Sequence, residues 1–161
     1  ARLGKAFKET TFNPSRVSTW KRWISCAGLL WDKKNTMLPD LTQRVERTLD
    51  TVLERLDASS GEELDPHRVF EVLQHELPYI VGGPLFSTIA HEEAGYEPPI
   101  NETGWLLSLA LRELEFQQRI ELLTRDDPVR PLILPKTPVH AVPESVVGIV
   151  ISTFDASESS R

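Results

Sequence analysis

The stretch between residues 10 and 38 constrains the fold most, because it joins a well-capped amphipathic helix to a hairpin pattern. Asn13 is a favourable helix N-cap, and Pro14 suits the first helical position. Apolar residues then recur at steps of three and four, which is typical of one buried helical face: Val17, Trp20, Ile24 and Ala27. Gly28 is a residue type that commonly ends a helix. The pattern therefore predicts a helix over residues 14–27.

A hairpin is predicted directly after this helix. Residues 29–31 are apolar, residues 32–35 form a polar turn, and residues 36–38 supply a return strand. Upstream, residues 3–10 have the spacing of a second helix, and residues 11–14 suit a tight turn. The order helix, turn, capped helix and hairpin resembles the winged helix-turn-helix superfamily. Because the pattern starts in mid-domain, we expect a further helix before it in a longer native chain.

Charge is distributed unevenly along the chain. The first 34 residues carry eight basic and two acidic side chains, a net charge of +6, whereas residues 35–161 have a net charge of −12. A recognition helix needs polar side chains for base edges, and a wing needs cations for phosphates. The resemblance and the charge together predict contact with double-stranded DNA through the following residues: Ser15, Arg16, Ser18, Thr19, Lys21, Arg22, Lys33 and Lys34. The alternative is an ordinary solvated helix face, or a basic head that docks onto an acidic partner.

An amphipathic helix is predicted over residues 39–57, with one apolar stripe: Leu41, Val45, Leu49, Val52 and Leu56. We assign it to the first unit as a connecting helix, so that this unit spans residues 1–57. It could pack on the neighbouring domain or form a short dimer seam. Residues 58–63 are small and polar, and they are the clearest linker in the chain.

A second unit is predicted over residues 64–134, because the complete winged-helix order is present there. Three helical patterns are followed by a strand at residues 120–123 and a return strand at residues 132–134. The predicted fold class is therefore α+β, mainly α with small β-hairpins, with two winged-helix-like units in tandem. Residues 135–161 form a proline-rich tether, an apolar strand for which a helix is the alternative, and a disordered tail.

The third helix of the second unit, predicted over residues 101–118 with Asn101 as its cap, suits proteins better than DNA. Its polar positions and the turn that follows are rich in carboxylates, which repel phosphates. Besides a broad apolar arc, it carries a separate apolar stripe of Trp105, Leu109 and Phe116. We predict that this stripe contacts a protein partner or a second copy in a homodimer. The alternative is that the helix at residues 39–57 covers it.

No catalytic constellation is evident in the sequence. Gly82 and Gly83 lack the lysine of a phosphate-binding loop, and His91 lacks the second histidine of a zinc motif. Cys26 is the only cysteine, and no apolar run is long enough to cross a membrane. We therefore expect no enzyme activity, no metal, no cofactor and no membrane partner, and a cytoplasmic location, or a nucleoid or nuclear one if DNA is bound.

Two functional hypotheses remain open from the sequence. In the first, the chain is a DNA-binding or DNA-associated tandem winged-helix protein whose first unit contacts nucleic acid and whose second unit mediates assembly. In the second, it is a non-enzymatic subunit of a larger complex, in which winged helices serve as docking modules.

Overall fold

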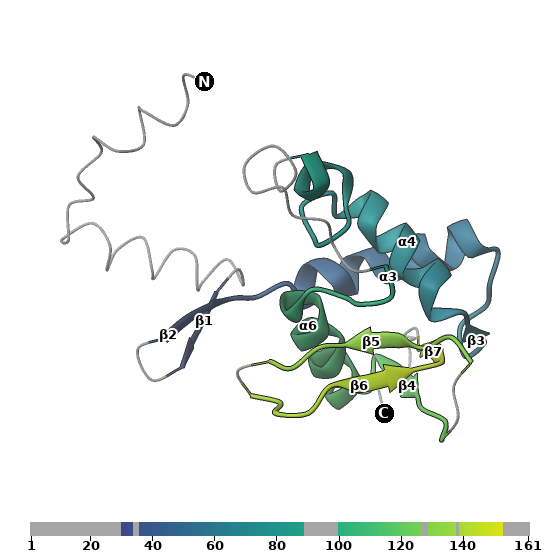
Figure 1. Cartoon of the computed structure of the whole chain (residues 1–161). Coiled ribbons are helices and arrows are strands. Elements are labelled where there is room, and N and C mark those ends of the chain that lie inside the picture. The colour runs from purple at the N-terminus through teal and green to yellow at the C-terminus, as the bar shows by residue number, and fades with distance from the viewer. Residues whose placement is uncertain (1–29, 34–35, 89–99, 127–128, 138, 153–161) are drawn as a thin grey trace, which may run out of the picture. The chain divides into compact units, whose positions relative to one another are not determined.

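The computed structural model describes residues 30–33, 36–88, 100–126, 129–137 and 139–152 (Figure 1). Backbone contacts divide the chain into two compact units, residues 1–40 and residues 41–161. Within the described residues, helices alternate with small antiparallel sheets, which places the chain in the α+β class.

The described part of the first unit is a hairpin of β1 (Leu30–Lys33) and β2 (Thr36–Pro39). The strands are antiparallel, with Trp31 opposite Leu38. This confirms the hairpin predicted from the sequence, although β1 extends two residues into the predicted turn and β2 ends one residue later than predicted. The helices predicted over residues 3–10 and 14–27 lie outside the described residues.

Three helices organise the second unit: α3 (Thr42–Leu56), α4 (Pro66–Glu76) and α6 (Trp105–Phe116). The predicted cap and proline start α4, because the Asp65 carboxylate accepts a hydrogen bond of 2.8 Å from the His67 N–H. Asp57 ends α3 in the left-handed conformation, at a φ of 51°. Residues 84–88 are also helical.

The division between units differs from the predicted boundary at residues 58–63. The middle of the predicted stripe is buried, with Val45 and Val52 fully inaccessible, and its ends Leu41 and Leu56 are partly buried, because α3 packs against both α4 and α6. A helix that buries its apolar face on two neighbours belongs to their core. Consequently α3 is part of the unit 41–161, and residues 58–62 are a connection inside that unit.

The main sheet has three short antiparallel strands in the order β3-β7-β4. These are β3 (Glu63–Leu64), β7 (Gly148–Ile151) and β4 (Ile120–Leu123). The predicted pairing of residues 120–123 with residues 132–134 is wrong, because β4 pairs with β7 instead. The apolar run at residues 146–151 is confirmed as strand, and its β-branched residues favour that conformation. Its second part, β7, is the central strand of this sheet because it pairs with both β3 and β4.

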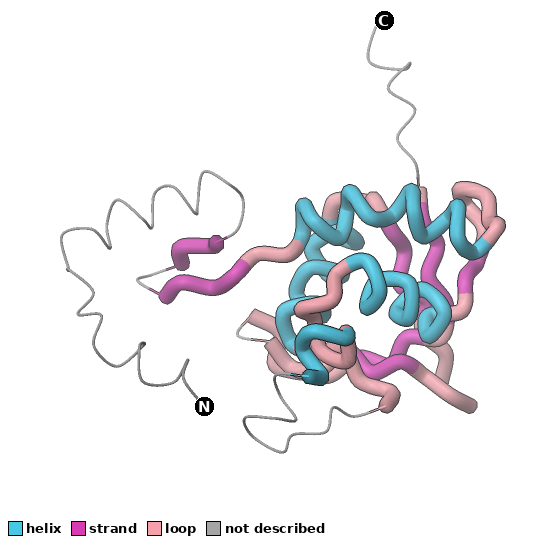
Figure 2. Tube along the Cα trace, turned by 90° about the horizontal axis from the view of Figure 1, so that it is seen from above, coloured by secondary structure: helices cyan, strands magenta, loops and turns pink. Residues whose placement is uncertain are grey.

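Residues 132–134 belong to a separate two-stranded ribbon of β5 (Leu132–Leu134) and β6 (Glu144–Val146). Val147 joins the ribbon to β7, and its N–H donates to the Leu123 carbonyl at 2.8 Å. The residues predicted as a tether and strand therefore fold back as part of this ribbon and of the main sheet. In Figure 1 the ribbon runs beside α6, and Figure 2 shows the helices and strands of the unit from above.

The ribbon is attached to the segment before α6 as well as to the core. Ile133 donates to the Asn101 carbonyl at 2.7 Å, and its own carbonyl accepts from the Thr103 N–H at 3.0 Å. Asn101 was expected to cap the helix, but α6 starts after Gly104 because residues 101–103 pair with β5. Leu132, Leu134 and Val146 are at most 1% exposed, so the ribbon contributes fully buried side chains to the core.

We predict that Leu134→Ala lowers the free energy of unfolding by about 2–5 kcal/mol, the usual cost of truncating a fully buried leucine. Val129→Ala is the matched control, since this side chain is fully exposed and its loss should change stability by less than about 0.5 kcal/mol. Urea unfolding of both variants measures the difference. Equal stabilities would show that the ribbon is not part of the folding core.

Candidate interaction surfaces

Helix α6 is covered along most of its length. Leu107, Ser108, Leu109, Ala110, Leu111, Arg112 and Leu114 are all buried. On one side, α6 packs against α3 and β4. On another side, α6 is hydrogen-bonded to the connection between β5 and β6. There the Ser108 hydroxyl donates to the Pro135 carbonyl at 3.0 Å. A helix enclosed in this way presents no continuous side-chain face of its own to a groove of DNA.

Arg112 is the main polar link between α6 and the ribbon. Its side chain is only 6% exposed. One terminal nitrogen donates to the carbonyls of Leu134 and Val142, at 3.4 and 3.3 Å. Its Nε lies 3.3 Å from a carboxylate oxygen of Glu144, which completes an ion pair. A charge is tolerated inside the fold only when it is paired and hydrogen-bonded. The ion pair with Glu144 and the two long hydrogen bonds meet this need in part, because the buried Nε–H itself makes no hydrogen bond.

Glu115 lies beside this link. Its carboxylate accepts a hydrogen bond of 3.1 Å from the Leu122 N–H. Burial raises the pKa of the Glu115 carboxyl above its ordinary value, and the neighbouring carboxylates of Glu144 and Glu121 add to the rise. The Leu122 N–H and the Arg112 guanidinium act in the opposite direction on this pKa but do not outweigh burial.

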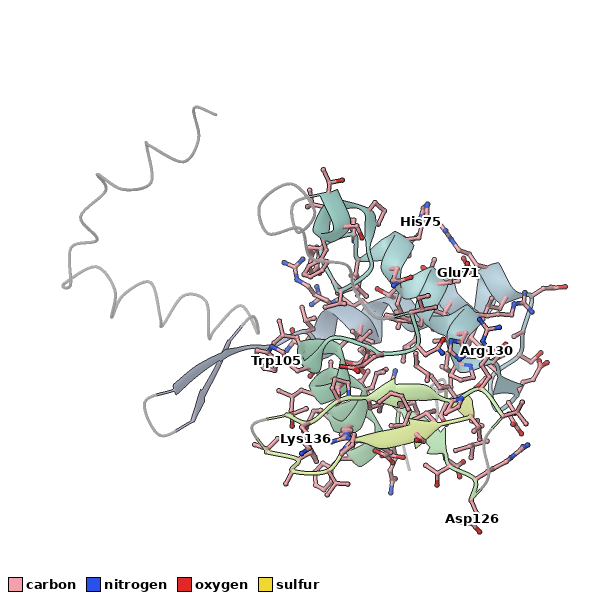
Figure 3. All side chains as sticks on the ribbon, viewed as in Figure 1. Glu71, His75, Trp105, Asp126, Arg130 and Lys136 are labelled. Carbon is pink, nitrogen blue, oxygen red and sulfur yellow. The ribbon has the colours of Figure 1, made fainter. Side chains whose placement is uncertain are left out.

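The predicted stripe on α6 is not one continuous surface. Trp105 is 39% exposed and Phe116 is 82% exposed, but Leu109 between them is buried at 7%. Leu109 therefore belongs to the packing of the unit itself, and the two aromatic residues lie near opposite ends of the helix. Figure 3 shows Trp105 at the start of α6.

Each aromatic residue borders its own hollow. Trp105 lines an apolar cavity of about 170 Å³ together with Tyr79, Val81 and Phe86. Phe116 lines a wider and shallower groove of about 570 Å³, which we call the Phe116 groove. Its other lining residues are Arg112, Glu115, His140, Ala141, Val142, Pro143 and Glu144.

The predicted DNA-contacting residues of the first unit lie largely outside the described residues. These are Ser15, Arg16, Ser18, Thr19, Lys21, Arg22 and Lys34. Lys33 is described through its backbone alone, as the last residue of β1. Their joint contact with DNA therefore stays a prediction from the sequence.

Within the described ranges, no group of three or more histidine, cysteine, aspartate or glutamate side chains is placed to hold a metal ion. None of the helices found there combines the length and apolar character needed to cross a membrane.

Sequence reasoning missed the roles of Arg112 and of residues 135–146. On a helical projection Arg112 falls beside the stripe of Trp105 and Phe116, with Glu115 three residues further along, and not on the broad apolar arc. Its position therefore looked like that of an ordinary solvated charge, and the sequence carried no signal of its burial. The spaced prolines of residues 135–143 concealed the ribbon, because they suggested an extended tether.

These features define an α+β protein with a basic N-terminal segment and an acidic unit whose central helix is covered. The chain belongs to the DpdG-like family, whose family model matches residues 1–128. No curated protein and no solved structure matches it.

We predict that Arg112→Met lowers the free energy of unfolding by about 2–3 kcal/mol, because hydrogen bonds from a charged donor contribute about 1.5–3 kcal/mol. The matched control is Arg125→Met, which removes the exposed ion pair to Glu63 and should cost less than about 1 kcal/mol. Chemical unfolding measures both. A loss no larger than in the control would show that Arg112 does not hold the ribbon.

Glu115→Gln tests the electrostatics of the same region. Because the folded protein binds the Glu115 proton more tightly than the unfolded chain, the ionised carboxylate opposes folding above its raised pKa. This penalty disappears as the pH falls through that pKa. We therefore expect Glu115→Gln, which keeps an acceptor for the Leu122 N–H, to be the more stable protein at neutral pH. The two stabilities should converge in acid when unfolding is measured across pH, and a difference independent of pH would contradict the assignment.

Proposed function

We propose that residues 42–151 form a winged-helix unit with an enlarged wing. Its elements follow the order α3, β3, α4, α6, β4, ribbon and β7. In the three-stranded sheet, β7 lies between β3 and β4. In this assignment α3 is the first helix of the unit and β7 the return strand, so that the unit extends beyond the predicted limits 64–134 on both sides. Together with the first unit, it gives the chain two such units in tandem.

The first unit is the DNA-contacting part in this proposal. Its eight cations in the first 34 residues, with only two acidic residues, give the local positive charge that phosphate binding requires. Its hairpin places Lys33 at the end of β1, next to the turn. DpdG is a protein of a DNA-modification system, which supports a DNA-related role for a member of its family.

The second unit mediates assembly with proteins. The observation that carries this assignment is the enclosure of α6, the helix that would have to enter a DNA groove in such a unit. Exposed aromatic side chains at both of its ends supply apolar contact area instead. The protein is then a non-enzymatic, DNA-associated component of a larger complex, in the cytoplasm or on the nucleoid.

We predict that duplex DNA binds the full chain with an affinity that falls steeply with salt, as expected for phosphate contacts. The double substitution Lys21→Glu and Arg22→Glu should weaken binding by about tenfold or more at fixed salt, because it removes two cations and adds two repulsive charges. Electrophoretic mobility shift and fluorescence anisotropy, with a salt titration, measure the effect.

The matched control reverses two exposed cations of the second unit, Arg130 and Lys136 (Figure 3). This variant should bind DNA as the native protein does. Absence of binding at low salt would remove DNA contact from the proposal and leave a docking subunit. Equal losses in both variants would show that the contact is not localised in the first unit.

A further inference from the structure

The Phe116 groove combines exposed apolar area with a negatively charged rim. Phe116 is 82% exposed and Val142 is 70% exposed, and the exposed residues Ala141 and Pro143 line the same groove. Large aromatic side chains left in water at a hollow are typical anchors of protein interfaces. The groove therefore offers a place for one large apolar side chain from another molecule.

Its charged residues leave a net negative rim. Glu115 and Glu144 both line the groove. The Arg112 guanidinium is buried and directed to the Leu134 and Val142 carbonyls and to Glu144, so it neutralises one carboxylate at most. An occupant that brings a cation would be favoured by this rim.

We propose that the Phe116 groove docks a basic, apolar segment of a partner protein. One large apolar side chain of that segment packs on Phe116 and Val142, and a lysine or arginine beside it faces the carboxylate of Glu115. This inference rests on the proposed assembly role of the second unit and names the chemistry of its partner.

The same charges argue against two other occupants. A second copy docked through the same groove by a two-fold axis would bring the two sets of carboxylates together, and like charges in an interface cost affinity. Nucleic acid would place phosphates against the same carboxylates. Charge complementarity thus selects a protein segment that carries positive charge.

A peptide library tests the proposal with the full chain as bait. We expect random dodecapeptides displayed on phage to be enriched for sequences that pair lysine or arginine with a large apolar residue. The best peptide, made with a fluorescent label, should bind more weakly as salt rises. Phe116→Ser should reduce its affinity by about tenfold or more, as loss of an aromatic anchor usually does. Glu115→Gln should reduce it by a smaller factor.

The matched control is Val129→Ser, which removes a fully exposed apolar side chain that does not line the groove. It should leave peptide affinity unchanged. The proposal is overturned if no basic, apolar sequence is enriched, or if binding is the same in Phe116→Ser. It is also overturned if light scattering shows self-association of the chain that is lost in Phe116→Ser. DNA binding is measured separately, so failure of the peptide test and failure of the DNA proposal are distinguishable.

Discussion

The contact between helix α6 and the β5–β6 ribbon is the constraint on which the rest of the second unit depends. The ribbon supplies Leu132, Leu134 and Val146 to the core, all nearly inaccessible to solvent. Arg112 joins the same two elements by two hydrogen bonds to backbone carbonyls and an ion pair with Glu144. Without the ribbon, the Arg112 charge would lose its partners and the apolar side chains that the ribbon covers would be exposed.

This contact also decides what the unit can bind. A helix packed on both α3 and the ribbon has no free face for base recognition, whatever its position in the topology. The exposed area that remains is aromatic and lies at the helix ends, and one end is bordered by carboxylates. Protein contacts suit that surface better than phosphates do. A basic first unit and an acidic second unit offer different surfaces within one chain, as the proposed division between DNA contact and protein assembly requires.

Local signals in the sequence predicted much of the fold. The stripe of α3, the Asp65–Pro66 start of α4 and the pairing of the first hairpin all depend on neighbouring residues, and each was predicted correctly. The pairing of β4 was not, because two short apolar segments, residues 132–134 and 148–151, compete for it and only long-range packing decides between them. The division of the Trp105–Phe116 stripe by buried Leu109 was hidden for the same reason.

Hydrogen–deuterium exchange of the full chain, with and without duplex DNA, tests the central claim most directly. The account predicts that the amides of α6 and of the ribbon exchange slowly in both states, and that added DNA protects amides only within residues 1–40. Fast exchange in the ribbon, or protection of α6 by DNA, would contradict it, because either result would mean that the ribbon leaves the helix open to a nucleic acid.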